Sequence, residues 1–367
     1  MTPSVHIKYG QPLVWEAPLL QPFRIASGQH DRLANALFVV ELSDGIKGYG
    51  EAGVATHITG ETLEETMRIL RQAGKDLAGR SPTEYLAVSA QLHEEWPRNK
   101  SAVAAVEMAL LDALTRHMRI PLWSLFGPAP RKLVTDITLV LSDLAETEAS
   151  ARKYYRAGFR KFKIKIGSDP GLDLDRVRMV HRHCPRSRIY LDANQGYTVK
   201  GILDFMRELK AAGITPALLE QPVAKADWDG LKEVAARLDV PVCADESASS
   251  LADCFRLIRQ KITPVINIKL MKTGLFPSRE IALFCRAKGI KLMIGAMMES
   301  SVSSMAAAHL AAGLGCFEYI DLDTPLFIAK GYDRNPYLSS SGVYDLSRVK
   351  AGLGIIPRIP PAISQKA

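Results

Sequence analysis

Short apolar runs alternate with helical stretches along the chain after residue 132. The runs are DITLVL, KFKIKI, RIYLD, PALLE, VPVCAD, VINIKL, KLMIG and FEYID. Strands separated by helices in this way predict βαβ units and a parallel sheet. Eight such units are the number that closes a barrel, so we expect an α/β fold of the TIM-barrel type over residues 126–325.

The first part of the chain has a different rhythm. Residues 35–42 and 46–53 predict two strands, joined by a hairpin at Ser43-Asp44-Gly45. Helical patterns follow at 61–78, 82–95 and 99–118. Strands followed by helices are typical of a small α+β domain, which we expect over residues 1–125.

Charged residues recur once per unit in the predicted barrel. Acids end three of the apolar runs, and lysines lie in KIK and NIKL; the residues are Asp192, Glu220, Asp245, Lys163, Lys165 and Lys269. From Lys165 to Lys269 the successive spacings are 27, 28, 25 and 24 residues, each the length of one strand and one helix. Because the carboxyl ends of parallel barrel strands meet at one mouth, these side chains should converge there.

The alternation of side chains along a strand indicates which way the lysines point. Lys163 and Lys165 share one face of KFKIKI with Lys161, whereas Phe162 and Ile164 share the other face with Ile166. The apolar face must pack against helices, so the lysine face points into the barrel. Buried lysines need counter-charges or a lowered pKa, and the three carboxylates provide counter-charges.

Three carboxylates on neighbouring strands form a set of hard oxygen ligands, which suits Mg²⁺ with open positions for substrate and water. Histidine and cysteine do not occupy these positions, which disfavours zinc. Each acid alone could instead cap the following helix. Three acids in register with two lysines favour a metal site.

Two lysines beside a divalent ion indicate proton transfer next to a carboxylate. A lysine acts as a base when burial or positive charge brings its pKa toward neutrality, and a metal ion stabilises the enolate that forms. Lys165 on the second strand and Lys269 on the sixth should face each other across the mouth. One can remove the proton from one face while the other delivers a proton to the opposite face, which is racemisation or epimerisation.

Five segments resemble the enolase superfamily in its muconate lactonizing enzyme subgroup: KIK at 163–165, DANQGY from 192, LLEQP around Glu220, CADES around Asp245 and INIKLMKTG around Lys269. The resemblance implies a modified (β/α)7β barrel with an N-terminal α+β capping domain and a C-terminal segment, 326–367, that returns to it. It also implies Mg²⁺ on the three acids, Lys165 and Lys269 as the acid/base pair, and Lys163 on the substrate carboxylate.

The mandelate racemase branch of the superfamily is disfavoured, because it would need a catalytic histidine after the seventh strand, where this chain has GAMMES. His309 lies in AAAHLAAG and is expected to pack in the core. Glu299, within GAMMES, has two interpretations: a hydrogen-bond acceptor that supports the site, or the cap of a helix.

Asp321 and Asp323 in IDLDTP face the same way at the end of the eighth strand. Two more acids at the mouth repel each other unless a cation binds there. In similarity to dipeptide epimerases, the pair would hold the substrate ammonium while the C-terminal residue is epimerised. The alternative is that they cap a loop. Thr138, on the first strand, resembles a further substrate contact.

Selectivity for the substrate side chain should come from two loops of the capping domain, residues 15–31 and 53–61, together with Met297 and Met298. Phe23, Ile58 and the methionines suggest an adaptable apolar wall. Arg24 is a further candidate contact, but epimerases acting on alanyl-glutamate would have an arginine deeper in the first loop. Apolar and cationic dipeptides therefore both remain open.

Other reactions of the subgroup are alternatives: cycloisomerisation, o-succinylbenzoate synthesis and N-acylamino acid racemisation. None of them explains the paired aspartates. An alternative of another class is a binding protein, for instance for nucleic acid, because the net charge is +8. The basic residues are spread over the chain and mixed with acids, so we expect a small-molecule dipeptide substrate and no nucleic acid or membrane partner.

The cysteines indicate the redox state of the protein's cellular compartment. All five lie outside any CxxC spacing and mostly in apolar stretches, which is typical of reduced structural thiols. The N-terminal residues lack a signal-peptide pattern, and no stretch is apolar enough for a membrane span. We expect a cytoplasmic homo-oligomer.

Overall fold

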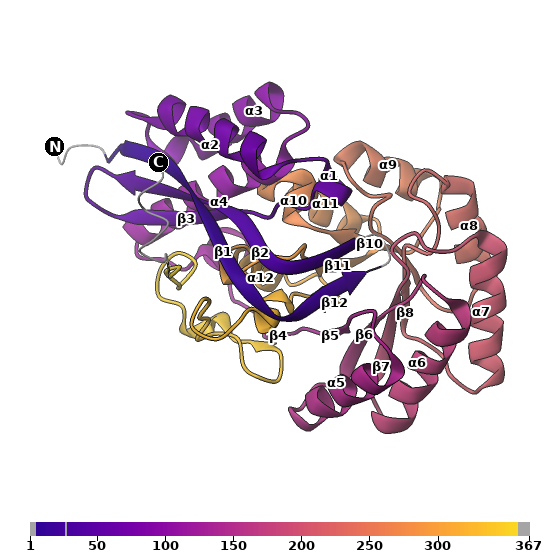
Figure 1. The fold of residues 1–367 in the computed structure, drawn as a ribbon. Coiled ribbons are helices and arrows are strands. Elements are labelled where there is room, and N and C mark those ends of the chain that lie inside the picture. Colours follow the sequence, from indigo (N-terminus) through magenta and orange to yellow (C-terminus); the bar gives the residue numbers. More distant parts are fainter. Residues whose placement is uncertain (1–4, 26–27, 359–367) are drawn as a thin grey trace.

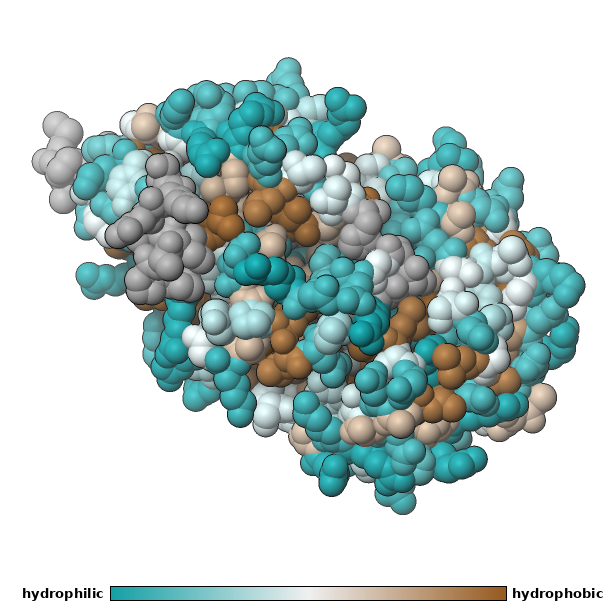
Figure 2. Space-filling model, in the orientation of Figure 1, coloured by the Kyte–Doolittle hydropathy of each residue, from teal (hydrophilic) through white to brown (hydrophobic). Residues whose placement is uncertain are grey.

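A computed structural model describes residues 5–25 and 28–358. A strand-rich N-terminal domain packs against a barrel of parallel strands surrounded by helices (Figure 1). Apolar side chains reach the surface seen in Figure 2 only in separate patches among hydrophilic ones. In the described part of the chain, every helix is too short or too polar to cross a bilayer.

The capping sheet is antiparallel, with strand order β1-β2-β3, and its strands are β1 (Ile7–Ile25), β2 (Gly28–Leu42) and β3 (Lys47–Ala52). The predicted strands at 35–42 and 46–53 fall in β2 and β3. The expectation of a loop over 15–31 was wrong, because this segment is the far end of the β1–β2 hairpin; its residues 26–27 lie outside the described residues. Pro12 and Pro18 hide the strand signal, and an edge strand tolerates them.

Three helices of the capping domain match the predicted ones closely: α2 (Leu63–Leu77), α3 (Tyr85–Glu95) and α4 (Lys100–His117). The short helix α1 (Thr56–Thr59) was not predicted, because it lies in the segment 53–61 that was expected to be a loop. The apolar, alanine-rich α4 is buried against β3. Two glycines of β3 make this contact possible, because a Cβ atom at Gly48 or Gly50 would lie 2.2 or 1.9 Å from a backbone oxygen of α4. The close contact fixes the sheet on the helix.

The barrel has all eight predicted strands, which are parallel and follow one another in chain order: β5 (Ile137–Leu139), β6 (Lys161–Lys165), β7 (Arg188–Asp192), β8 (Leu218–Glu220), β9 (Val242–Ala244), β10 (Val265–Ile268), β11 (Lys291–Gly295) and β12 (Tyr319–Asp321). The Asp136 amide, just before β5, donates to the Ile320 carbonyl on β12 at 3.0 Å and links the two ends of the sheet. The expected barrel is confirmed.

Helices follow the barrel strands and cover its outside: α5 (Leu144–Arg156), α6 (Pro170–His183), α7 (Val199–Ala211), α8 (Trp228–Arg237), α9 (Leu251–Arg259), α10 (Leu270–Thr273), α11 (Leu275–Ala287) and α12 (Ser301–Leu314). Inside the barrel, an apolar layer closes the amino-terminal end; it contains Tyr190, Leu218, Cys243, Val265, Met293 and Tyr319. Polar groups of the barrel interior therefore lie toward the opposite, carboxyl-terminal mouth.

The C-terminal segment returns to the capping domain. The Leu353 amide donates to Asp112 of α4 at 2.6 Å, and the Trp15 indole of β1 donates to the Arg358 carbonyl at 3.0 Å. Two short strands, β4 (Leu133–Val134) and β13 (Val343–Tyr344), pair beside the barrel. These contacts support the domain boundaries that we propose at residues 125 and 325.

Candidate active site

A pocket at the carboxyl end of the barrel collects residues from both domains. The β1–β2 hairpin contributes Phe23 and His30, and the loop after β3 contributes Ala55 and Ile58. The barrel contributes most of the predicted candidates: Thr138, Lys163, Lys165, Lys269, Met297, Met298, Asp321 and Asp323. The chain thus brings together lysines, paired aspartates and an apolar wall.

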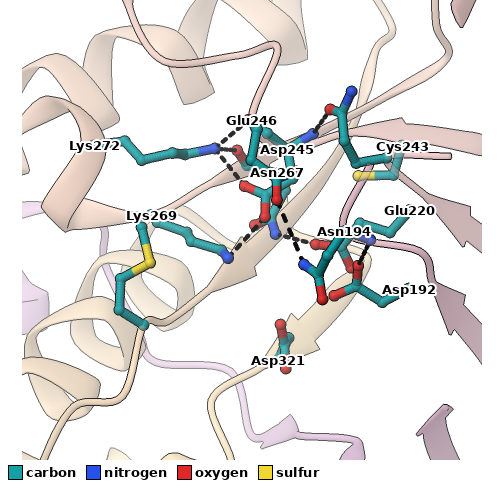
Figure 3. A network of polar contacts seen from close by, with 12 residues as sticks. Asp192, Asn194, Glu220, Cys243, Asp245, Glu246, Asn267, Lys269, Lys272 and Asp321 are labelled. Carbon is teal, nitrogen blue, oxygen red and sulfur yellow. Dashed lines mark hydrogen bonds and ion pairs between the residues drawn. The ribbon is translucent and has the colours of Figure 1, made fainter. Parts of the chain in front are cut away.

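Lys165 and Lys269 approach the pocket from opposite sides of the barrel, because β6 and β10 are four strands apart in the sheet order. The Lys165 ammonium donates to Asp192 Oδ2 at 2.6 Å and to Asn194 Oδ1 at 3.1 Å. The Lys269 ammonium lies 2.7 Å from Asp245 Oδ2 (Figure 3). Both side chains are almost fully buried at their stems and line the same pocket.

Lys163 lies deeper than the other two lysines and contacts three carboxylates. Its ammonium is 2.7 Å from Asp321 Oδ2, 2.8 Å from Glu220 Oε2 and 2.9 Å from Asp192 Oδ2. Burial lowers the pKa of Lys163, but the three carboxylates outweigh burial and raise it well above the ordinary value. The three carboxylates therefore favour the charged form of Lys163.

The three predicted metal ligands lie at the ends of adjacent strands β7, β8 and β9. Asp192 is paired in register with Glu220, and Asp245 directly follows β9. Burial acts to raise the pKa of Asp192 and Asp245, but nearby lysines lower both well below the ordinary range. Burial and the Asp192 charge raise the pKa of Glu220 to about 8.

Lys272 was not predicted, yet it is part of the same network. Its ammonium donates to Asp245 Oδ1 at 2.7 Å and to the Asn267 carbonyl at 2.9 Å, and the Asn267 amide donates to Glu220 Oε1 at 2.9 Å (Figure 3). Lys272 and Asn267 could have been found by their spacing from Lys269. They hold two of the acids in place.

The expected lowering of the lysine pKa does not occur at Lys269 in this structure. Burial lowers its pKa, but the Asp245 carboxylate outweighs burial and raises it well above the ordinary value. Asp245, although it is shared with Lys272, therefore disfavours the neutral form of Lys269 in this arrangement.

The acids at β7, β8 and β9 fit a hard cation by their chemistry. They offer carboxylate oxygens, and the fully buried Glu220 Oε2 accepts no hydrogen bond although its counter-charge Lys163 is close. Lysine ammonium groups lie against all three acids. Within the described residues, the acids whose oxygens all lie within 4.8 Å of one another are Asp136, Asp321 and Asp323.

Asp321 and Asp323 are held by the backbone between them. The Leu322 amide donates to Thr135 Oγ1 at 2.8 Å, and the Tyr344 hydroxyl donates to the Leu322 carbonyl at 2.6 Å. Asp323 Oδ2 also accepts the Thr138 amide at 2.6 Å. Burial and Asp321 raise the pKa of Asp323 to about 7.

Asp136 lies beside this pair and was not predicted. Both of its carboxylate oxygens are buried without a hydrogen-bond partner. Burial and the two neighbouring aspartates raise its pKa well above the ordinary value. The strand alternation that places Thr138 inward also places Asp136 inward, and this signal could have found it.

Arg24 is separated from the other candidates. It does not line the pocket; its exposed guanidinium donates to Gln29 Oε1 at 2.8 Å, while its carbonyl accepts the Leu141 amide. The structure therefore gives no support to Arg24 as a substrate contact.

His309 is a core residue, as predicted. Its Nδ1 accepts the Trp123 amide at 3.0 Å, and burial lowers its pKa to about 4. Glu299 accepts the Met297 amide at 2.6 Å and the Ser303 hydroxyl, so it supports the loop before α12.

The apolar wall of the pocket joins the two domains. Met297 and Met298 follow β11 and are nearly fully buried, and Ile58 and Phe23 come from the capping domain. The Phe23 ring meets the edge of Phe327, after β12, with centroids 5.2 Å apart. The hairpin tip is thus packed onto the barrel beside the paired aspartates.

Comparison with known proteins covers almost the whole chain. Residues 11–127 match the mandelate racemase/muconate lactonizing enzyme N-terminal domain, and residues 146–359 match the enolase C-terminal domain-like family. The hydrophobic dipeptide epimerase of Citrifermentans bemidjiense is 46% identical over 94% of this chain and 96% of its own.

Two solved structures are also similar. The substrate-liganded L-Ala-D/L-Glu epimerase of Bacillus subtilis has a TM-score of 0.92 at 31% identity, over 96% of this chain and 99% of its own. The dipeptide epimerase of Enterococcus faecalis, complexed with Mg and L-Leu-L-Tyr, has a TM-score of 0.89 at 30% identity, over 95% and 99% of the two chains. This chain therefore belongs to the mandelate racemase/muconate lactonizing enzyme family of the enolase superfamily.

Proposed function

We propose that this protein is a Mg²⁺-dependent dipeptide epimerase. One observation carries the proposal: Lys165 and Lys269 enter one pocket from opposite strands, and the same pocket contains the pair Asp321 and Asp323. The relatives named above, all epimerases of dipeptides, support it. The reaction inverts the α-carbon of the C-terminal residue.

The lysines would carry the proton. With the α-carbon between them, one lysine in its neutral form removes the proton from one face, and the other, as an ammonium, donates to the opposite face. Lys163, whose ammonium lies against Asp321 as well as two of the proposed metal ligands, is suited to hold the substrate carboxylate rather than to transfer a proton.

Asp192, Glu220 and Asp245 would hold the Mg²⁺. When bound, the ion supplies Lewis-acid stabilisation of negative charge on the substrate carboxylate. With Asp245 among its ligands, the ion would also compete with Lys269 for this carboxylate, whose charge raises the pKa of that lysine. The Mg named with the Enterococcus faecalis structure supports the choice of ion.

Asp321 and Asp323 would bind the substrate ammonium, which supplies the cation that two neighbouring carboxylates need. Thr138 fixes Asp323 through its amide and lines the same part of the pocket. With the ammonium held at this pair, the C-terminal residue would be the one that extends toward Lys165 and Lys269, which line the same pocket.

The substrate side chain at the C-terminal position is proposed to be apolar. Met297, Met298 and Ile58 supply apolar lining to the pocket, and the Arg24 guanidinium contacts Gln29 instead of the pocket. The relative that is 46% identical is named a hydrophobic dipeptide epimerase, which also favours an apolar side chain. A cationic side chain, left open by the sequence, would meet no acid along this wall.

The test is a panel of L,L-dipeptides with a common N-terminal alanine and C-terminal leucine, glutamate or lysine, incubated with enzyme and Mg²⁺. Chiral chromatography would follow formation of the L,D-product. The proposal expects kcat/KM to be highest for leucine. Conversion of none of the three would contradict the epimerase activity, and preference for glutamate or lysine would contradict only the apolar pocket.

We further propose that the enzyme acts in the cytoplasm as a homo-oligomer. All five cysteines are free, and four are buried, which fits a reducing compartment. Light scattering of the purified protein measures the oligomeric state directly, and the mass of a monomer would contradict the proposed homo-oligomer.

A further inference from the structure

Two buried polar residues of the capping sheet contact the loop that carries the apolar wall. Glu51 on β3 is completely buried, and Asn35 on β2 is 2% exposed. The Ser300 amide donates to Glu51 Oε1 at 2.9 Å, and the Ser303 amide donates to Glu51 Oε2 at 3.2 Å. Both donors belong to the start of α12, which directly follows Met297 and Met298 in the chain.

Asn35 connects the two sides of the wall. Its amide nitrogen donates to the Met298 carbonyl at 2.9 Å and to Glu51 Oε1 at 2.7 Å. Its amide oxygen accepts the Val54 amide at 3.0 Å, in the loop that leads to Ala55 and Ile58. One side chain therefore sets the spacing between the barrel loop and the loop of the capping domain.

The arrangement has a clear physical basis. A helix N-terminus presents free N–H groups and a partial positive charge, and here a carboxylate from another domain satisfies them. Residues 296–300 lie between β11 and α12, so neither a strand ladder nor a helix fixes their backbone. Glu51 and Asn35 add bonds from the capping domain to the one that Glu299 makes within this stretch.

We propose that Glu51 and Asn35 are positioning residues that fix the Met297–Met298 wall and so determine which C-terminal side chain the pocket accepts. This inference rests on the proposed dipeptide epimerase function. Neither residue lines the pocket, so both act through the loop and not by touching the substrate.

The test compares Glu51→Gln with a matched control, Glu107→Gln. Glu107, also from the capping domain and 1% exposed, accepts the amide of Leu275 at the start of another barrel helix, α11. The quantity measured is kcat/KM for Ala-Leu divided by kcat/KM for Ala-Ala. Glu51→Gln should lower this ratio roughly 10-fold, because small displacements far from the chemistry have large kinetic effects. Glu107→Gln should keep the wild-type ratio. An unchanged ratio in Glu51→Gln, or the same change in the control, would overturn the proposal.

A second measurement does not depend on turnover. Hydrogen exchange of the amides from Met297 to Ser303 should become faster in Glu51→Gln than in the wild type and stay unchanged in Glu107→Gln. If the wild type acts on no dipeptide, the proposed function fails while this readout still tests the positioning role. Should Glu51→Gln not fold, Asn35→Ala carries the same two measurements, and wild-type exchange in that variant would refute the role.

Discussion

Lys269 has a single carboxylate partner, Asp245, and that partner is also held by Lys272. Removing the Lys269 side chain should therefore leave the charge of Asp245 compensated and the fold intact. We predict that Lys269→Ala lowers kcat by roughly 10³-fold, the scale of one lost acid/base group, with little change in melting temperature. Steady-state kinetics and circular dichroism measure both.

Lys161→Ala is the control for this prediction. Lys161 lies on the same face of β6 but donates to the Val134 carbonyl, away from the pocket. The Lys161→Ala variant should keep a kcat near that of the wild type. Wild-type turnover by Lys269→Ala would show that the Lys269 amine does not transfer the proton.

The pH dependence of substrate binding should report on Asp323. Its pKa in the folded protein is raised to about 7, so the carboxylate that attracts the ammonium is present above this pH and is lost as the pH falls through it. A dipeptide ammonium loses its proton near pH 8. We predict that KM is lowest between these values and rises on both sides.

Asp323→Asn should raise KM and remove its rise on the acid side, since no group at this position then gains a proton. A wild-type KM that stays flat from pH 5.5 to 7.5 would contradict the assignment of Asp323 to the ammonium.

At the residue scale, alternation along one strand predicted the inward lysines, since each apolar neighbour had to face a helix. The same rule did not reveal how charges are shared. Lys163 contacts three acids from three strands, and Asp136 approaches Asp321 although 185 residues separate them. Such partners depend on which strands lie beside one another after the barrel closes.

At the element scale, the short strand β13 supports the pair Asp321 and Asp323 through the Tyr344 hydroxyl. We predict that Tyr344→Phe leaves the Leu322 carbonyl without its donor, at a cost of about 1 kcal/mol, and loosens both aspartates. KM for the dipeptide should rise about fivefold if that energy is lost from binding, with kcat nearly unchanged.

Tyr197→Phe is the matched control, because its buried hydroxyl donates to Asp173 at 2.9 Å and lies off the pocket. It should lose comparable stability and keep the wild-type KM. Equal KM changes in the two variants would show that Tyr344 has no particular role in substrate binding.

Elements with strong periodicity were predicted well, and the failure to predict β1 has a physical explanation. The barrel strands are buried on both sides and read as continuous apolar runs. Strand β1 is an edge strand that contains prolines, and its tip packs on the barrel through Phe23 and Phe327. Its signal comes from pairing with β2, which a local pattern does not contain.

At the scale of the whole molecule, Mg²⁺ should stabilise the fold. Any ligand that binds only the folded state adds about 2.7 kcal/mol at 100 times its dissociation constant. We predict a higher melting temperature with Mg²⁺, and a shift that is lost or needs at least about 10-fold more Mg²⁺ in Asp245→Asn. An equal shift in both proteins would place the ion elsewhere.

The junction between the domains lay beyond the reach of sequence reasoning. Glu51 and Ser300 are 249 residues apart, and each reads as an ordinary polar position in its own segment. Only the packing of the capping sheet on the barrel brings them together, which is why the supports of the apolar wall were not predicted while the wall itself was.

Proton exchange in D₂O tests the central claim most directly. With Mg²⁺ and an apolar L,L-dipeptide, the account predicts deuterium at the α-carbon of the C-terminal residue and none at that of the N-terminal residue, observed by NMR and mass spectrometry. Deuterium at the N-terminal residue, or at neither residue with any dipeptide, would contradict it.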